Sequence, residues 1–129
     1  MEIKIEGLEK LLNEFKIAAN NISRDTAETL ENTANNIINL AKDSMKEGHG
    51  IPSNPGEPPH KQTHNLAESI DITKLSDHSF SIGTDVDYGK DLEFGTSTME
   101  ARPWLRPAFE QGGKNLIKDL TEDINKGFS

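Results

Sequence analysis

Residues 92–109 read LEFGTSTMEARPWLRPAF: a short apolar run, a glycine, a polar stretch and two Arg-Pro pairs around a tryptophan. Trp104 is the only tryptophan in the chain. The stretch has no metal-ligand spacing, no glycine-rich phosphate loop and no nucleophile in a catalytic motif. Its residue types therefore indicate a role in shape or assembly, not in chemistry.

Arg102 and Arg106 lie four residues apart at the expected start of a helix, on either side of Trp104. Arginine pairs with carboxylates in a bidentate manner and stacks on aromatic rings, and Trp and Arg are enriched at binding hot spots. One interpretation is contact with a neighbouring subunit. The other interpretation is an intramolecular ion pair with Glu93 or Glu100. The sequence favours neither interpretation over the other.

The residues before this stretch alternate in character, which is typical of strands with one buried face. The apolar members all occupy even positions: Phe80, Ile82, Val86, Tyr88, Leu92 and Phe94. The pattern predicts strands at about 78–84 and 88–95. A third strand at 68–75 completes a small antiparallel meander.

The residues after the stretch predict a C-terminal helix. Its apolar stripe consists of Leu105, Phe109, Leu116, Leu120, Ile124 and Phe128. Pro107 is tolerated only in a first turn, so the helix begins between 103 and 107. Gly112 and Gly113 each weaken a helix by roughly 1 kcal/mol relative to alanine, which predicts a kink or two shorter pieces.

In the N-terminal region the spacing of apolar residues changes from alternation to the helical period. Ile3 and Ile5 alternate with charged residues and favour a short edge strand. Helical spacing follows in two runs that share one register, Leu8, Leu11, Leu12, Phe15, Ala19, Ile22 and then Leu30, Ala34, Ile37, Ala41, Met45. They form either one helix from about 8 to 46 or two helices, and Ser23 as an N-cap favours a break there.

Residues 46–65 hold four prolines and three glycines, a density that excludes a helix or a central strand. Loops of about 20 residues are usually functional or disordered. The sequence therefore predicts one α+β domain over 1–129. Its N-terminal amphipathic helix or helices and its C-terminal helix pack on a small antiparallel sheet, with this Pro-rich loop between them.

Composition limits the function classes. The net charge of −8 disfavours non-specific nucleic-acid binding and anionic membrane surfaces. We expect no membrane segment, no signal peptide and no cofactor, and the absence of cysteine excludes disulfides and thiolate zinc sites.

Histidines are the residues that would support an enzyme. The four are His49, His60, His64 and His78, and none belongs to a His-Glu-x-x-His motif. We expect solvated loop histidines and no enzymatic activity. The alternative is a small metal-dependent hydrolase that uses His60 and His64.

Two motifs resemble the signature of a phage protein family, the head–tail joining or tail-completion proteins of the gene-product-ten-like type, also described as minor tail or neck proteins. The first comprises Tyr88, Glu93, Phe94, Gly95, Thr96, Ala101, Arg102, Pro103, Trp104, Leu105, Arg106 and Pro107. The second comprises Pro55, Gly56, Pro58, Pro59, Thr63, Leu66, Ser69 and Ile70. They occur in the same order as in the family, and with the flanking helices the resemblance spans nearly the whole chain.

The resemblance implies a virion structural protein, made in the cytoplasm of a bacterial host, that assembles into a ring around the DNA channel. Its partners would be its own copies, commonly six, and other connector or tail proteins, with no sequence-specific nucleic acid and no membrane. An adaptor encoded by a host through an integrated prophage is a further interpretation.

A head-to-tail ring uses two different patches on each subunit. We predict that one patch is the corner formed by Tyr88, Glu93, Phe94, Gly95, Thr96, Arg102, Pro103, Trp104, Arg106 and Pro107. The Pro-rich loop, with Pro55, Pro58 and Pro59, is the predicted second patch.

Overall fold

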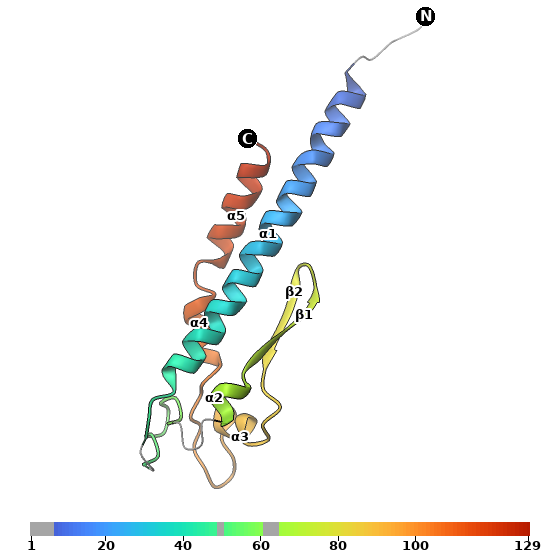
Figure 1. The fold of residues 1–129 in the computed structure, drawn as a ribbon. Coiled ribbons are helices and arrows are strands. Elements are labelled where there is room, and N and C mark those ends of the chain that lie inside the picture. Colours follow the sequence, from blue (N-terminus) through green and yellow to red (C-terminus); the bar gives the residue numbers. More distant parts are fainter. Residues whose placement is uncertain (1–6, 49–50, 61–64) are drawn as a thin grey trace, which may run out of the picture.

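The structure is a computed structural model that describes residues 7–48, 51–60 and 65–129. It is an α+β fold, as predicted, in which one long N-terminal helix runs along the molecule and most of the other elements lie against it (Figure 1). In chain order the elements are α1 (Leu8–Ser44), α2 (Asn65–Ser69), β1 (Asp71–Ser76), β2 (Ser79–Gly83), α3 (Tyr88–Phe94), α4 (Arg106–Gly112) and α5 (Leu116–Gly127). The edge strand predicted around Ile3 and Ile5 lies outside the described residues.

Helix α1 is continuous over 37 residues, so the break favoured near Ser23 is wrong. The hydroxyl of Thr26 donates to the carbonyl oxygen of Ile22 at 2.6 Å, a bond to the preceding turn. The polar side chains in this region are thus accommodated within a running helix. The two apolar runs are in register because they belong to one helix.

Strands β1 and β2 form an antiparallel hairpin, in which Ile72 pairs with Ile82 and Lys74 with Phe80. This agrees with the two strands expected near 68–75 and 78–84. The third strand, expected at 88–95, is wrong, because Tyr88–Phe94 is helix α3. Tyr88 and Leu92 are four apart, a spacing that fits one helical face as well as an alternating strand.

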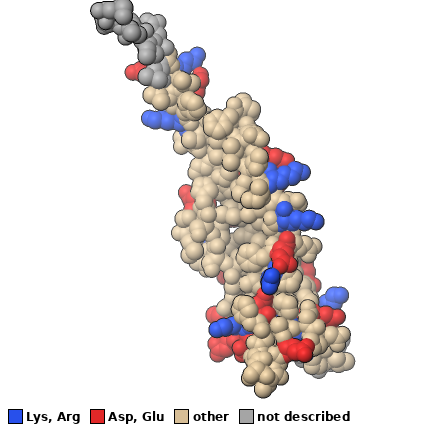
Figure 2. All heavy atoms as spheres, turned by 180° about the vertical axis from the view of Figure 1, so that it is seen from behind, with Lys and Arg blue, Asp and Glu red and all other residues tan. Residues whose placement is uncertain are grey.

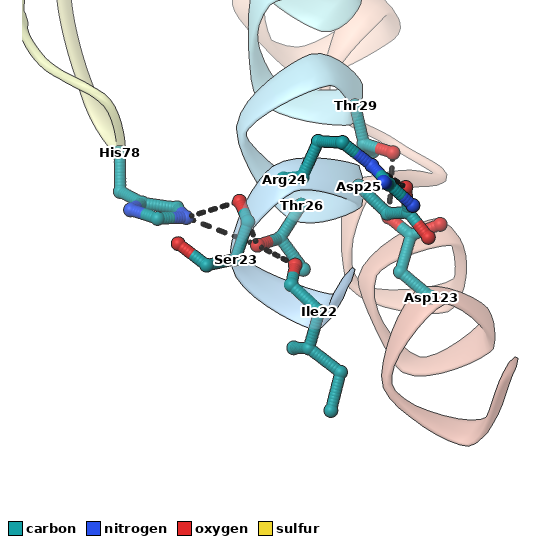
Figure 3. Close-up of polar contacts among 8 residues, drawn as sticks. All are labelled: Ile22, Ser23, Arg24, Asp25, Thr26, Thr29, His78 and Asp123. Carbon is teal, nitrogen blue, oxygen red and sulfur yellow. Dashed lines mark hydrogen bonds and ion pairs between the residues drawn. The ribbon is translucent and has the colours of Figure 1, made fainter. Parts of the chain in front are cut away.

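The hairpin tip is attached to the middle of α1 (Figure 3). The Nε2–H of His78 faces the carbonyl oxygen of Ser23 and the hydroxyl oxygen of Thr26, at 3.0 Å from each. His78 therefore holds the hairpin against the helix.

The C-terminal helix is divided into α4 and α5, which confirms the interruption predicted at Gly112 and Gly113. A Cβ at Gly112 would lie 2.6 Å from Cγ1 of Ile37, so this glycine allows α4 to approach α1 closely. Farther along, the hydroxyl of Thr29 donates to Oδ2 of Asp123 at 2.5 Å (Figure 3). Polar contacts thus contribute to holding α5 on α1.

The apolar core occupies one end of the molecule, where α1 ends and α2, α3 and α4 meet (Figure 1). Its buried members are Ile37, Ile38, Ala41, Met45, Leu66, Ala67, Ile70, Trp104 and Ala108. Before Ala34, the described part of α1 contains one buried apolar residue, Ala18. The N-terminal half of the long helix therefore lies outside the core.

Candidate functional site

The two stretches predicted as separate interface patches fold into one surface. Nε of Arg102 donates to the carbonyl oxygen of Ser53 at 3.1 Å, and the amide of Gly56 donates to the carbonyl oxygen of Ala101 at 2.8 Å. These bonds attach the Pro-rich loop to the 95–102 segment within one subunit. The two predicted patches therefore adjoin within one subunit, and their role as interfaces stays a prediction.

A pocket of about 790 Å³ opens between them. Its walls come from the end of α1, the Pro-rich loop, α2, α3 and the 95–102 segment, and they are mostly apolar. Lining residues include Met45, Pro59, Leu66, Tyr88, Leu92, Thr96, Met99 and Arg102. We refer to this pocket and the surrounding residues 88–107 as the corner pocket.

Gly95 determines the path of the chain at this corner. It has φ 75°, which glycine adopts without strain, and its amide donates to the carbonyl oxygen of Asp91 at 2.7 Å to end α3. A Cβ here would lie 2.8 Å from the backbone nitrogen of Ala101. The returning segment then joins α3 again through the amide of Arg102, which donates to the carbonyl oxygen of Leu92 at 2.6 Å.

Glu93 organises the start of α4. Its carboxylate accepts hydrogen bonds from the backbone amides of Trp104, Leu105 and Arg106 at 2.7, 2.9 and 2.9 Å. The first amides of a helix have no partner within the helix, and Pro107 has no amide hydrogen to satisfy. One carboxylate thus caps α4, and its negative charge is favourable at that end of a helix.

Trp104 anchors the corner from inside. Its side chain is 3% exposed, and its indole Nε1–H donates to the carbonyl oxygen of Gly89 at 2.8 Å. A Cβ at Gly89 would lie 2.6 Å from Cγ2 of Thr84, so the close packing here requires glycine. The interface role predicted for Trp104 does not fit this position, because the side chain is enclosed by its own subunit.

The two arginines have different surroundings. Arg102 is half-buried and binds the Pro-rich loop, whereas the Arg106 side chain is 81% exposed and pairs with Glu110 at 3.1 Å. The ion pairs considered from the sequence, with Glu93 or Glu100, are not the ones seen among the described residues. Glu93 is instead engaged by backbone amides.

The remaining predicted interface residues fall into an exposed group and a group that is half-buried or buried. Pro55, Tyr88, Phe94, Thr96 and Pro107 are exposed, with Phe94 at 76%. Pro58, Gly95 and Pro103 are half-buried, and Pro59 is buried. The surface available to a partner therefore centres on Phe94 and the pocket rim, while Pro59 and Trp104 support it from beneath.

One polar group in the pocket wall is unpaired. Ser53 is 5% exposed, and among the described residues its hydroxyl has no hydrogen-bond partner. A buried unpaired hydroxyl costs roughly 1–3 kcal/mol. A partner group that entered the pocket and bonded to it would recover part of that free energy.

The chemistry available at the pocket is limited. Its ionisable members are Asp91, His60, Arg102 and the phenol of Tyr88, and Nδ1–H of His60 donates to the carbonyl oxygen of Ile51 at 2.8 Å. Within residues 7–48, 51–60 and 65–129 no three His, Cys, Asp or Glu side chains are grouped to hold a metal. His49 and His64 lie outside the described residues. The arrangement is suited to receiving an apolar side chain with a polar neighbour.

Sequence reasoning did not identify Ser53, Met45 or Met99 as pocket residues. Met45 belongs to the helical stripe of α1, and this stripe was the signal that it would be buried. Ser53 and Met99 lie in loops, where no period indicates which side chain faces inward.

Comparison with protein-family models, with curated proteins and with solved structures finds no match for this chain. Among the helices of the described residues, none combines the length and apolar character needed to cross a membrane.

Proposed function

We propose that the chain is a virion structural subunit of a phage head–tail junction, which assembles with its own copies into a ring around the DNA channel. The resemblance of its two sequence motifs to that family supports this role. The observation that carries the proposal is that both motifs meet at one surface, the corner pocket, instead of serving separate parts of the fold.

The corner pocket has the features of a protein-binding surface. Phe94 is 76% exposed and lies in the chain between Leu92 and Thr96, which line the apolar pocket. The hydrogen bonds of Glu93 and Trp104 keep this segment in place. Aromatic side chains beside pockets are typical of binding hot spots. A ring subunit needs such a surface, and its neighbour supplies the complementary patch.

The charge of the chain is consistent with a conduit for DNA. With a net charge of −8, the protein lacks the basic excess that holds nucleic acid through phosphate contacts. Figure 2 shows one face of the molecule, with uncharged surface over much of its middle and charged side chains of both signs at its two ends and along one edge. DNA that passed such a ring would not be retained by it.

The first test is the mass of the assembly. The purified chain is measured by light scattering alone and after mixing with the connector and tail proteins encoded beside it. We expect a ring or a stable complex in at least one mixture. A chain that binds neither protein and forms no ring at any concentration would count against the proposal.

The surface assignment is tested with Phe94→Ala, which removes an exposed ring. We expect ring or complex formation to weaken by about tenfold or more, as for a hot-spot residue. Leu75→Ala is the matched control, because Leu75 is 64% exposed on the hairpin and away from the corner pocket. Equal assembly of the two variants would place the interface elsewhere.

A further inference from the structure

The N-terminal half of α1 carries an apolar stripe that α5 covers along one side, at Phe15 and Ile22, and that the rest of the described chain leaves open along the other. We propose that two copies of the chain pair through this segment in antiparallel orientation. We call residues 8–22 the α1 arm. This pairing goes beyond the ring, because it uses a different surface from the corner pocket and requires no phage partner.

The stripe has the spacing of a coiled coil. Leu12, Phe15, Ala19 and Ile22 follow one another at intervals of three, four and three residues, the alternation of a and d positions in a heptad. Leu12 and Phe15 are 52% and 54% exposed, and Ala19 is exposed too. An apolar seam of this kind is stable in water only when a second helix covers it.

The hairpin ends before the exposed part of the stripe, whereas α5 continues along one side of it. The hairpin tip meets α1 at Ser23 and Thr26, and beyond that point the arm projects past it (Figures 1 and 3). Helix α5 flanks the arm on one side and is capped by Phe128, whose ring meets that of Phe15 edge-on with centroids 6.4 Å apart. Phe128 itself remains 62% exposed, so it extends the open apolar surface.

The charged residues beside the stripe indicate that its partner is a second copy of the chain, in antiparallel orientation. Glu9 and Lys16 are seven residues apart and occupy equivalent e positions on the same flank. Along one helix that separation is about 10 Å, too long for an ion pair. Neither residue has an ion-pair partner among the described residues. In an antiparallel pair, e positions face e positions, so Glu9 of each copy meets Lys16 of the other.

A parallel pair would lack this complementarity. There, e positions face g positions, and those of the arm include Leu11 and Ala18, which carry no charge. The antiparallel arrangement is also compatible with the rest of the fold. The core and hairpin of each copy lie toward its residue 44, so the two bodies extend away from each other at opposite ends of the paired arms (Figure 1).

The pairing is expected to be reversible. With Glu9 opposite Lys16, the paired arms overlap over residues 8–19, about 18 Å, which provides few core layers, so a weak dimer is expected. Sedimentation velocity of the purified chain across a concentration series measures it directly. We expect a monomer–dimer equilibrium, and a chain that stays monomeric to millimolar concentration would overturn the proposal.

Reversing the charge at position 9 or position 16 tests the proposed contact between these positions of the two copies. Glu9→Lys and Lys16→Glu each place like charges at both inter-chain sites and raise the dissociation constant about tenfold. The double variant, and an equimolar mixture of the two single variants, restore opposite charges and regain the affinity. Single variants that pair like the unaltered chain, or a double variant as weak as the singles, would refute the antiparallel contact.

Orientation has an independent readout because the chain contains no cysteine. Mixed Glu9→Cys and Lys16→Cys chains should form an inter-chain disulfide between positions 9 and 16, whereas either variant alone should form little. Ile17→Ala is the control, since Ile17 lies on the opposite side of α1 and should leave pairing unchanged. Phe94→Ala should also leave it unchanged, which separates failure of this proposal from failure of the ring.

Discussion

The two halves of α1 have the same pattern and different surroundings. Around Ile37, Ala41 and Met45 the apolar stripe is buried to 4% exposure or less, whereas Leu12 and Phe15 remain about half exposed. Both halves belong to one register of a single helix. The comparison teaches that an amphipathic stripe indicates a surface that needs to be buried. It does not identify whether the same chain or a second chain covers that surface.

The two halves of α1 differ in burial because different elements of the chain pack on each of them. The C-terminal half meets α2, α4 and Trp104, which together surround it. The N-terminal half meets the hairpin tip at Ser23 and Thr26 and, before that point, only α5 among the described elements, none of whose residues, all of them described, is buried. One end of the molecule is therefore a folded core, and the other is a two-helix extension with open apolar surface.

The largest effect is expected at the core end. Trp104→Ala removes a buried ring and its bond to Gly89, and should lower the free energy of unfolding by about 3–5 kcal/mol. Denaturant unfolding followed by circular dichroism measures it. Phe94→Ala, which truncates an exposed ring, is the control and should change stability little; similar losses for both variants would mean that Trp104 is not the anchor.

A smaller loss is expected from Glu93→Ala. It leaves three backbone amides of the α4 start without their acceptor, and should lower the free energy of unfolding by about 1–3 kcal/mol in the same denaturant titration. Glu93→Gln retains an acceptor oxygen and should lose less. If Glu110→Ala, which removes only the exposed partner of Arg106, costs as much as Glu93→Ala, the capping role is contradicted.

The hairpin attachment lies at the boundary between the two halves. His78→Ala removes the hydrogen bonds to Ser23 and Thr26 and should cost about 1 kcal/mol. Amide hydrogen exchange should accelerate in residues 71–83 more than in the core around Ile37. Uniform acceleration throughout the chain would show that the hairpin does not open separately.

The smallest effect on the monomer is expected in the arm. Phe15→Ala should change the free energy of unfolding by less than about 1 kcal/mol at dilute concentration, because the ring is already half exposed. The substitution also removes the edge-on packing of this ring against Phe128 at the end of α5. Thermal unfolding at high concentration should show that the variant lacks the concentration-dependent gain in stability that pairing gives the unaltered chain.

Several parts of the fold could be predicted from the sequence because they depend on local rules. The 3.6-residue period predicted helix over residues 8–46, alternation and turn residues predicted the hairpin, and Gly112 with Gly113 predicted the interruption between α4 and α5. The same period left one helix or two open, and Ser23 favoured a break that the structure does not contain. The errors occurred where local patterns are ambiguous. Tyr88–Phe94 fits both periods over seven residues, and packing of Gly89 under Trp104 favours the helix.

The candidate site was predicted in part. The two motifs indicated which residues matter, but not that Arg102 binds the loop at Ser53 or that Glu93 caps α4. Those bonds join residues 49 and 11–13 positions apart, and no pattern in the sequence encodes such partners. The sequence likewise indicated that Trp104 is important at this corner, but it did not show that the ring faces the interior of its own subunit.

The sequence by itself determined the helical character of residues 8–44, the hairpin, the interruption at Gly112 and Gly113, and the apolar stripe along α1, because these follow from side-chain period and backbone chemistry. Only the tertiary structure decided which part of that stripe is covered. Burial depends on segments distant in the chain reaching the same place, and among the described residues enough of them to form a core reach only the C-terminal half of the helix.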